Sequence, residues 1–295
     1  MSRESFALLE LKDGRALGYQ QYGHVDGTPL LVFHGLPGCR LQAGLLDEPA
    51  RRLGVRLIAA DRPGVGRSSP SPRRSVLAWS EDVAQLADHL GLVRFGVLGI
   101  SCGGPYALAC ALRLRERLGY VGLVAGMGPM DSPALRRGQH PALRLLFGLA
   151  RLHPALTAPL LGLDRRLFRR DPLLAVQRLA GMMTPPDRRF IGEHPELAEQ
   201  FALSLAEAYH PGIAGVQQEV RLIATARGFE LAEIDMPVHL YQGGQDRNVP
   251  PALAEHMARE LSQARYRFFA EEGHLSILCN RAEVFFADFL AARAG

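Results

Sequence analysis

One stretch of the sequence, residues 95–105, constrains the fold more than any other. An apolar run from Phe95 to Ile100 predicts a short buried strand, and an alanine-rich run from Tyr106 to Arg117 predicts a helix. Ser101 lies between them, with glycine at positions 99 and 103. A chain that turns from strand to helix within one residue holds that residue in a left-handed or strained conformation, and only small neighbours fit beside the turn. The sequence therefore predicts a serine hydroxyl displayed at the end of a strand.

Length and composition limit the classes of protein to consider. The 295 residues are 47% hydrophobic and 22% charged, which suits one large α/β domain with room for an insertion. A net charge of +4, spread along the chain, argues against nucleic-acid binding. The N-terminus has no signal-peptide pattern, and no run approaches the roughly 18 apolar residues of a membrane span. We therefore expect no stable membrane insertion, while a homodimer stays open.

The four cysteines show neither metal-ligand spacing nor a disulfide framework. A reducing, cytoplasmic location is the natural expectation for such a chain. No ligand cluster or phosphate-cradling loop is present, so we expect neither a metal nor an organic cofactor.

Strands and helices alternate through the first part of the chain. Residues 5–23 alternate around Asp13-Gly14 and predict an antiparallel hairpin. Strands are then expected at 29–33, 55–60, 95–100 and 121–126, with helices at 41–53, 76–90 and 106–117 between them. This order predicts a mostly parallel sheet with right-handed crossovers, flanked by helices.

The alternation stops between residues 131 and 232. Amphipathic stretches rich in Leu, Ala and Arg are cut by many prolines, which predicts several short helices that form a cap. Strands return at 237–241 and 266–269, with helices at 251–261 and 282–292. The expected domains are thus a core of residues 1–130 and 233–295 and an inserted, all-helical cap of residues 131–232.

Three chemically active residues, Ser101, Asp246 and His274, each follow a predicted strand. The carboxyl ends of parallel strands meet at one edge of a sheet, which would gather these side chains. The core motifs are His34-Gly35-Leu36-Pro37-Gly38, Asp61-Arg62-Pro63-Gly64, Gly99-x-Ser101-x-Gly103, Gly243-x-x-Asp246 and Glu272-Gly273-His274. Together they resemble the α/β-hydrolase fold superfamily over both parts of the core.

The resemblance implies a catalytic triad and an oxyanion hole. His274 would remove the proton of Ser101, and Asp246 would orient the imidazole. The backbone N–H groups of Leu36 and Cys102 would bind the oxyanion. Two alternatives stay open: Asp246 could be only a turn residue, and Asp131 occupies the acid position of some relatives. His34 and Asp61 are interpreted as residues that order their own loops.

The expected activity is cleavage of a small carboxylic ester through an acyl-enzyme. Proline-type aminopeptidases and carbon–carbon bond hydrolases use the same triad, and the former need cap carboxylates for the substrate amine. Glu193, Glu196, Glu199 and Glu207 leave that choice open. A binding protein with a slow or vestigial triad is the alternative from another class.

The predicted cap carries two further features. Its large apolar residues exceed what one core-facing stripe needs, and some are expected to line an acyl pocket: Phe147, Phe168, Met182, Met183 and Phe201. Residues 136–189 hold eleven arginines against three aspartates, and residues 190–235 are mainly acidic. These could be two mutually attractive solvated faces, or the pairs Arg165-Arg166 and Arg169-Arg170 could bind an acidic substrate or anionic surface.

Overall fold

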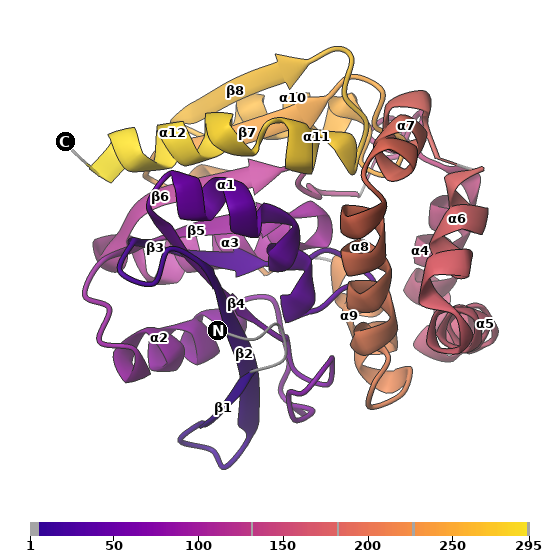
Figure 1. Cartoon of the computed structure of the whole chain (residues 1–295), viewed down its shortest axis with the longest axis horizontal. Coiled ribbons are helices and arrows are strands. Elements are labelled where there is room, and N and C mark those ends of the chain that lie inside the picture. The colour runs from indigo at the N-terminus through magenta and orange to yellow at the C-terminus, as the bar shows by residue number, and fades with distance from the viewer. Residues whose placement is uncertain (1–5, 131, 182, 226–227, 294–295) are drawn as a thin grey trace.

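The computed structural model describes residues 6–130, 132–181, 183–225 and 228–293. An eight-stranded sheet in the order β1-β2-β4-β3-β5-β6-β7-β8 forms its centre (Figure 1). Strands β3 to β8 are parallel, and β1 and β2 add an antiparallel hairpin at one edge. The predicted fold class, a mostly parallel α/β sheet of the α/β-hydrolase type, is confirmed.

The strands follow the apolar runs of the sequence closely. Their bounds are β1 Ala7–Glu10, β2 Ala16–Gly23, β3 Thr28–Phe33, β4 Val55–Ala60, β5 Phe95–Ile100, β6 Leu118–Val124, β7 Val238–Gly243 and β8 Ala264–Phe269. Every residue of β5 and β7 is buried, as expected of central parallel strands covered on both faces. The outermost strand, β8, alternates between partly buried and exposed residues instead.

Helices cover both faces of the sheet. One face carries α1 (Asp47–Arg52), α11 (Ser276–Asn280) and α12 (Ala282–Arg293), and the other carries α2 (Trp79–His89), α3 (Gly104–Arg113) and α10 (Pro251–Glu260) (Figure 1). Short 3-10 helices precede α1 (η1, Arg40–Leu46) and α3 (η2, Ser101–Gly103). Aromatic residues fill the layers between sheet and helices. Phe33 packs edge-on against Trp79 of α2, and the ring centroids of Tyr120 and Phe289 of α12 lie 5.4 Å apart.

Among the described residues, the segment between β6 and β7 forms six α-helices, and we call this segment the helical insertion. They are α4 (Pro141–Leu152), α5 (Ala158–Arg170), α6 (Pro172–Ala180), α7 (Pro185–Glu193), α8 (Pro195–Ala208) and α9 (Ala214–Ala224), with the 3-10 turn η4 (Pro154–Thr157) between α4 and α5. Proline opens α4 to α8 at the first or second position, where its missing N–H costs no hydrogen bond. The insertion lies beyond the carboxyl ends of the strands (Figure 1).

No helix in the described ranges is both long enough and apolar enough to cross a lipid bilayer.

The turn from β5 into α3 makes a first test of the structure. A Cβ added to Gly103 would lie 2.2 Å from the carbonyl oxygen of Phe33, so Gly103→Ala must displace the backbone of β3. We expect this variant to lower the free energy of unfolding by about 1–3 kcal/mol or more, measured by urea denaturation. Gly148→Ala in α4 is the matched control, because nothing lies within 4 Å of the added methyl. Equal stability of the two variants would contradict this account of the turn.

Candidate active site

Ser101 occupies the strained position that the sequence predicts. It follows β5 directly with a φ of +52°, in the left-handed region that non-glycine residues rarely adopt. The flanking glycines allow the turn to close: a Cβ on Gly99 would lie 2.6 Å from the carbonyl oxygen of Gly103. The side chain is 7% exposed. The hydroxyl is therefore held at the carboxyl edge of the sheet by the backbone itself.

Two unpaired backbone donors lie near this serine. Within the described residues, neither the N–H of Leu36 nor that of Cys102 donates a hydrogen bond to another protein group. Cys102 is adjacent to Ser101 in the chain, and the Leu36 loop approaches from β3, since a Cβ added to Gly35 would lie 3.3 Å from Ser101 Cβ. Burial raises the pKa of the Cys102 thiol to about 12, so this residue offers its amide rather than its sulfur.

His34 and Arg62 fix the loop that carries Leu36. His34 is buried, and its Nδ1 lies 2.9 Å from the carbonyl oxygen of Gly35. Arg62 donates to the carbonyl oxygens of His34 and Gly35, at 2.7 and 3.1 Å. Burial first, and then the Arg62 charge, lower the pKa of His34 well below its usual value. A neutral His34 with these contacts agrees with its interpretation as a residue that orders the loop.

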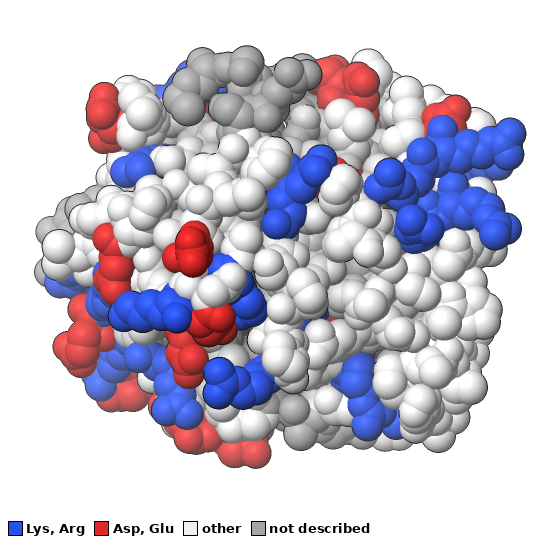
Figure 2. Space-filling model, turned by 90° about the horizontal axis from the view of Figure 1, so that it is seen from below, with Lys and Arg blue, Asp and Glu red and all other residues white. Residues whose placement is uncertain are grey.

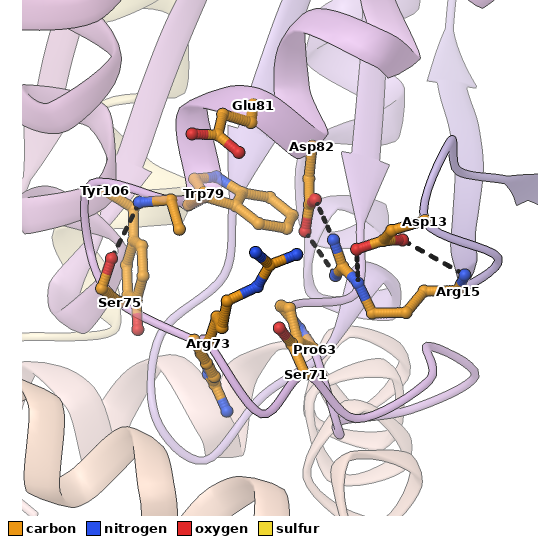
Figure 3. Close-up of a pocket in the computed structure, with 12 residues that line it drawn as sticks. Asp13, Arg15, Pro63, Ser71, Arg73, Ser75, Trp79, Glu81, Asp82 and Tyr106 are labelled. Carbon is orange, nitrogen blue, oxygen red and sulfur yellow. Dashed lines mark hydrogen bonds and ion pairs between the residues drawn. The ribbon is translucent and has the colours of Figure 1, made fainter.

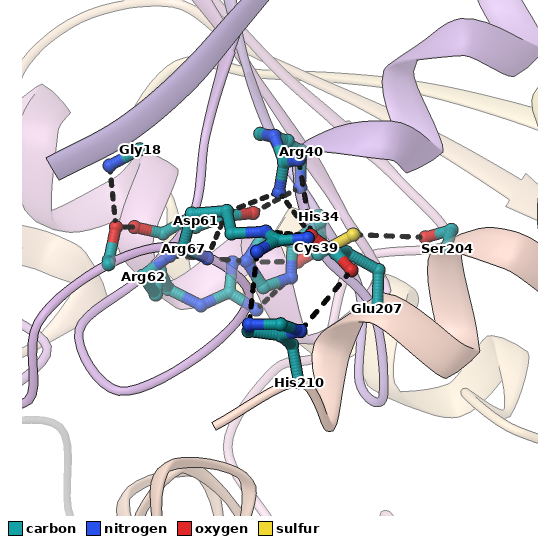
Figure 4. A network of polar contacts seen from close by, with 11 residues as sticks. Gly18, His34, Cys39, Arg40, Asp61, Arg62, Arg67, Ser204, Glu207 and His210 are labelled. Atoms are coloured by element: carbon teal, nitrogen blue, oxygen red, sulfur yellow. Dashed lines mark hydrogen bonds and ion pairs between the residues drawn. The ribbon is translucent and has the colours of Figure 1, made fainter. Parts of the chain in front are cut away.

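Asp61 lies at the centre of a second polar network beside the same loop (Figure 4). Its carboxylate accepts hydrogen bonds from the backbone N–H groups of Arg40 and Arg67 and from the Arg40 guanidinium, at 2.6 to 2.8 Å. Glu207 of α8 accepts from both arginines in turn. Asp61 thus orders its own loop, as interpreted from the sequence, and Glu207 ties the helical insertion to it.

A third buried network joins the insertion to the loop after β4. Glu219 of α9 forms ion pairs with Arg62 and with Arg74, and all three side chains are at most 1% exposed. Arg74 also donates to the carbonyl oxygen of Gly215, at 2.8 Å. Because Arg62 holds the Leu36 loop, a carboxylate of the insertion supports the region around the unpaired N–H groups.

Asp246 and His274 form a hydrogen-bonded pair at the ends of β7 and β8. Asp246 Oδ2 lies 2.7 Å from His274 Nδ1, while Oδ1 accepts the backbone N–H groups of Asn248 and Val249 at 2.8 and 2.9 Å. The carboxylate therefore orders its turn with one oxygen and contacts the imidazole with the other. Asp131, the alternative acid, lies outside the described residues.

Opposing effects act on the protonation of His274. Burial lowers the pKa of the imidazole, but the Asp246 carboxylate, by its charge and its hydrogen bond, outweighs burial, and the Asp187 charge adds to it. The net result is a pKa above the usual value. Within the described residues, no hydrogen bond joins the Ser101 hydroxyl to His274. Such contacts are often long before a substrate complex forms.

Asp187 of α7 is a residue of this site that sequence reasoning missed. The side chain is 4% exposed and accepts the backbone N–H groups of His274, Leu275 and Ser276, at 2.9 to 3.0 Å. The helical insertion therefore holds the loop that carries His274 in place through these three hydrogen bonds. The only local signal was an acidic residue in the first turn after Pro185-Pro186, which also suits an ordinary helix start.

The predicted pocket residues fall into different environments. Phe147 and Phe168 are buried among the insertion helices, at 2% and 4% exposure. Met183 and Phe201 are only partly buried. Met183 precedes the α7 segment that contacts the His274 loop, and Phe201 lies on α8, which packs against η1 after the Leu36 loop. Met182 lies outside the described residues.

One pocket of the structure lies apart from these residues. It measures about 220 Å³ between the β1–β2 turn and α2, and the ion pair of Arg15 with Asp82 crosses its wall (Figure 3). Trp79 and Tyr106 also line it. Since Ser101, Asp246 and His274 are not among the lining residues, this pocket takes no part in the arrangement described above.

The sheet, the serine turn and the paired aspartate and histidine define a class of protein. Residues 28–280 match the alpha/beta hydrolase fold family, and the chain belongs to that family. The resemblance inferred from the core motifs is thereby confirmed.

Relatives within the family are diverse. The chain is 30% identical over 204 residues to the dihydrolipoyllysine-residue acetyltransferase component of the acetoin cleaving system of Pseudomonas putida, a match that covers 62% of this chain and 54% of that protein. It is 33% identical over 108 residues to a proline iminopeptidase of Xanthomonas citri, covering 35% and 34%. The matched region thus spans about half or less of these relatives.

Solved structures share the fold over the whole chain. A thermophilic esterase from Thermogutta terrifontis superposes with a TM-score of 0.69 at 23% identity, covering 98% of both chains. An enol-lactonase from Burkholderia xenovorans gives a TM-score of 0.68 at 19% identity, covering 98% and 100%. At such identities the likeness describes the architecture alone.

Proposed function

We propose that this protein is a serine hydrolase that cleaves small carboxylic esters with Ser101, His274 and Asp246. The observation that carries the proposal is the strained φ of Ser101 beside two unpaired N–H donors, at the same sheet edge as the Asp246–His274 pair. A hydroxyl nucleophile, a base with an orienting carboxylate and preorganised oxyanion donors are the parts that acyl transfer needs.

The proposed reaction proceeds in two similar halves. His274 takes the proton of the Ser101 hydroxyl as the oxygen attacks the ester carbonyl, and the N–H groups of Leu36 and Cys102 bind the oxyanion. Asp246 stabilises the imidazolium, which protonates the leaving alcohol as the tetrahedral intermediate collapses to an acyl-enzyme. Water, deprotonated by the same imidazole, then attacks the acyl group and releases the acid.

The environments of the glutamates favour an ester over a peptide with a free amino terminus. Glu193, Glu196 and Glu199 are exposed, and Glu207 is engaged by Arg40 and Arg67. None of these four carboxylates is therefore both buried and available to hold a substrate amine. This argues against the proline iminopeptidase activity named for several relatives.

The cysteines support a reducing compartment, which we propose is the cytoplasm. Cys39, Cys102, Cys110 and Cys279 are all free thiols, and the first three are buried. Free thiols of this kind are usual in proteins of a reducing compartment.

Active-site labelling and substitution test the proposal directly. A fluorophosphonate should label wild-type protein stoichiometrically at Ser101, and Ser101→Ala should lower kcat for ester hydrolysis by about 10⁴-fold or more. His274→Ala should behave similarly, and Asp246→Asn should lose somewhat less because the imidazole keeps a partner. Absence of labelling and of turnover across esters, thioesters and lactones would indicate a binding protein instead. More than a tenth of the activity remaining in Ser101→Ala would reject the nucleophile.

The pH dependence of kcat/KM tests the base and Asp187 together. His274 must be neutral to accept a proton, so kcat/KM should rise with pH as the imidazole deprotonates. Because the pKa of His274 is raised, the midpoint of this rise should lie above pH 6.5. Asp187→Asn removes a charge that raises the pKa of His274, so the limb should move to lower pH. Asp171→Asn is the matched control, because Asp171 only caps α6. An unmoved limb in Asp187→Asn would contradict the role of Asp187.

The predicted acyl pocket gives a further test. Met183→Ala and Phe201→Ala should change the ranking of esters by acyl length, because these partly buried residues lie on segments that contact the two active-site loops. Phe147→Ala and Phe168→Ala should instead lower the free energy of unfolding by about 3–5 kcal/mol with the ranking kept. The measurements are kcat/KM across acyl lengths and urea denaturation. An unchanged ranking in both Met183→Ala and Phe201→Ala would place the pocket elsewhere.

A further inference from the structure

Exposed leucines are concentrated on one part of the helical insertion. Of the thirteen large hydrophobic side chains that are exposed among the described residues, seven lie between positions 145 and 174. They are Leu145 and Leu152 of α4, Leu156 of η4, Leu160, Leu163 and Leu167 of α5, and Leu174 of α6. Scattered exposed leucines need no explanation, but a group on neighbouring elements indicates a surface that binds something.

Helix α5 carries more large apolar side chains than its packing against the rest of the insertion requires. Leu161 and Phe168 are buried and attach the helix to its neighbours, while Leu160, Leu163 and Leu167 follow one another at helical spacing and stay exposed. Helix α5 contacts η4 and α6, which carry Leu156 and Leu174, and η4 in turn contacts α4, which carries Leu145 and Leu152. The helix therefore has a second apolar face that stays exposed in the part of the chain that the structure describes.

The same helix carries four arginines that face solvent. Arg165, Arg166, Arg169 and Arg170 are exposed, and none forms a hydrogen bond or an ion pair with a described residue. They line a pocket of about 700 Å³ beside Gly212 and Ile213. Figure 2 shows basic side chains gathered on the side of the molecule that the insertion forms, next to a broad area with few charges.

Three buried or partly buried acidic residues of the insertion are engaged away from these arginines. Glu207 and Glu219 pair with arginines of the core, and Asp187 is directed at the His274 loop. Among the described residues, the arginines of α5 thus form no ion pair with the acidic part of the insertion. These arginines remain available to an outside partner.

We propose that the leucine–arginine face, made of Leu160, Leu163, Leu167 and the four arginines of α5 with the neighbouring leucines, is a peripheral docking surface for an anionic lipid bilayer. An amphipathic helix in the membrane interface buries leucines among the acyl chains and pairs arginines with anionic headgroups, so one partner satisfies both kinds of side chain. The proposal does not depend on the triad.

Other binding partners would contact favourably either the leucines or the arginines of this face, but not both. A second copy bound through the same face would bring arginines against arginines, because a two-fold interface pairs a patch with itself. Nucleic-acid phosphates would pair with the arginines and leave the leucines in water. The combination of side chains therefore favours the bilayer.

Vesicle co-sedimentation tests the proposal. The wild-type protein should pellet with vesicles of equal parts phosphatidylcholine and phosphatidylglycerol, less at high salt, and should stay in the supernatant with phosphatidylcholine alone. The quadruple variant R165Q/R166Q/R169Q/R170Q should partition about 600-fold less, since each basic residue near an anionic surface adds roughly a factor of five. L160S/L163S/L167S should also lose binding.

Matched controls separate the face from net charge and general hydrophobicity. R94Q/R113Q/R259Q/R265Q removes four exposed arginines of the core, and L8S/V25S/V93S removes three exposed apolar side chains there. Both controls should bind like the wild type. All variants should hydrolyse a short water-soluble ester at the wild-type rate, which also shows that they are folded.

Three outcomes would overturn the proposal. If the wild-type protein does not pellet with the anionic vesicles, the bilayer is not the partner of this face. Equal loss of binding in the core controls assigns it to net charge rather than to this face. A dimer in light scattering that L160S/L163S/L167S converts to monomer assigns the face to a second copy. If ester turnover is absent while vesicle binding holds, the catalytic proposal fails and this one stands.

Discussion

The buried ion pairs between Glu219, Arg62 and Arg74 support much of the remaining structure. Charges this deep are costly to desolvate, and each is tolerated only because its partner is present. Arg62 also donates to the carbonyl oxygens of His34 and Gly35, which shape the loop of the unpaired Leu36 N–H. A carboxylate supplied by α9 thus allows an arginine of the core to organise the loop beside Ser101.

Three acidic residues of the helical insertion each stabilise a loop of the core beside the site. Glu207 meets Arg40 and Arg67 beside the Leu36 loop, Glu219 supports Arg62, and Asp187 accepts three backbone N–H groups at His274. The helical insertion therefore contacts both loops on which the proposed chemistry depends. Any movement of α7 or α9 would disturb the imidazole or the loop of the unpaired Leu36 N–H group, so the geometry of the insertion and that of the site are physically coupled.

Local rules made much of this predictable from the sequence. The strained Ser101 follows from a strand that turns directly into helical structure between two glycines. The Asp246–His274 pair follows from both residues lying just after neighbouring parallel strands. Asp187 could not be found in this way. Its importance comes from a contact with residues 274–276, nearly ninety positions away, and no periodicity or motif encodes that distance. The same is true of Glu219, which reads in sequence as one acidic residue of an amphipathic helix.

The uneven charge of the insertion follows from these contacts. Its buried carboxylates point toward the core because the loops they hold present arginines and backbone N–H groups there. The arginines of α5 form no ion pair with a described carboxylate, and they share their helix with exposed leucines. Exposed leucines beside arginines without ion pairs add nothing to the stability of a segment that only covers the site. The charge separation in the sequence thus corresponds to acidic side chains that pair inward and to arginines of α5 that face solvent.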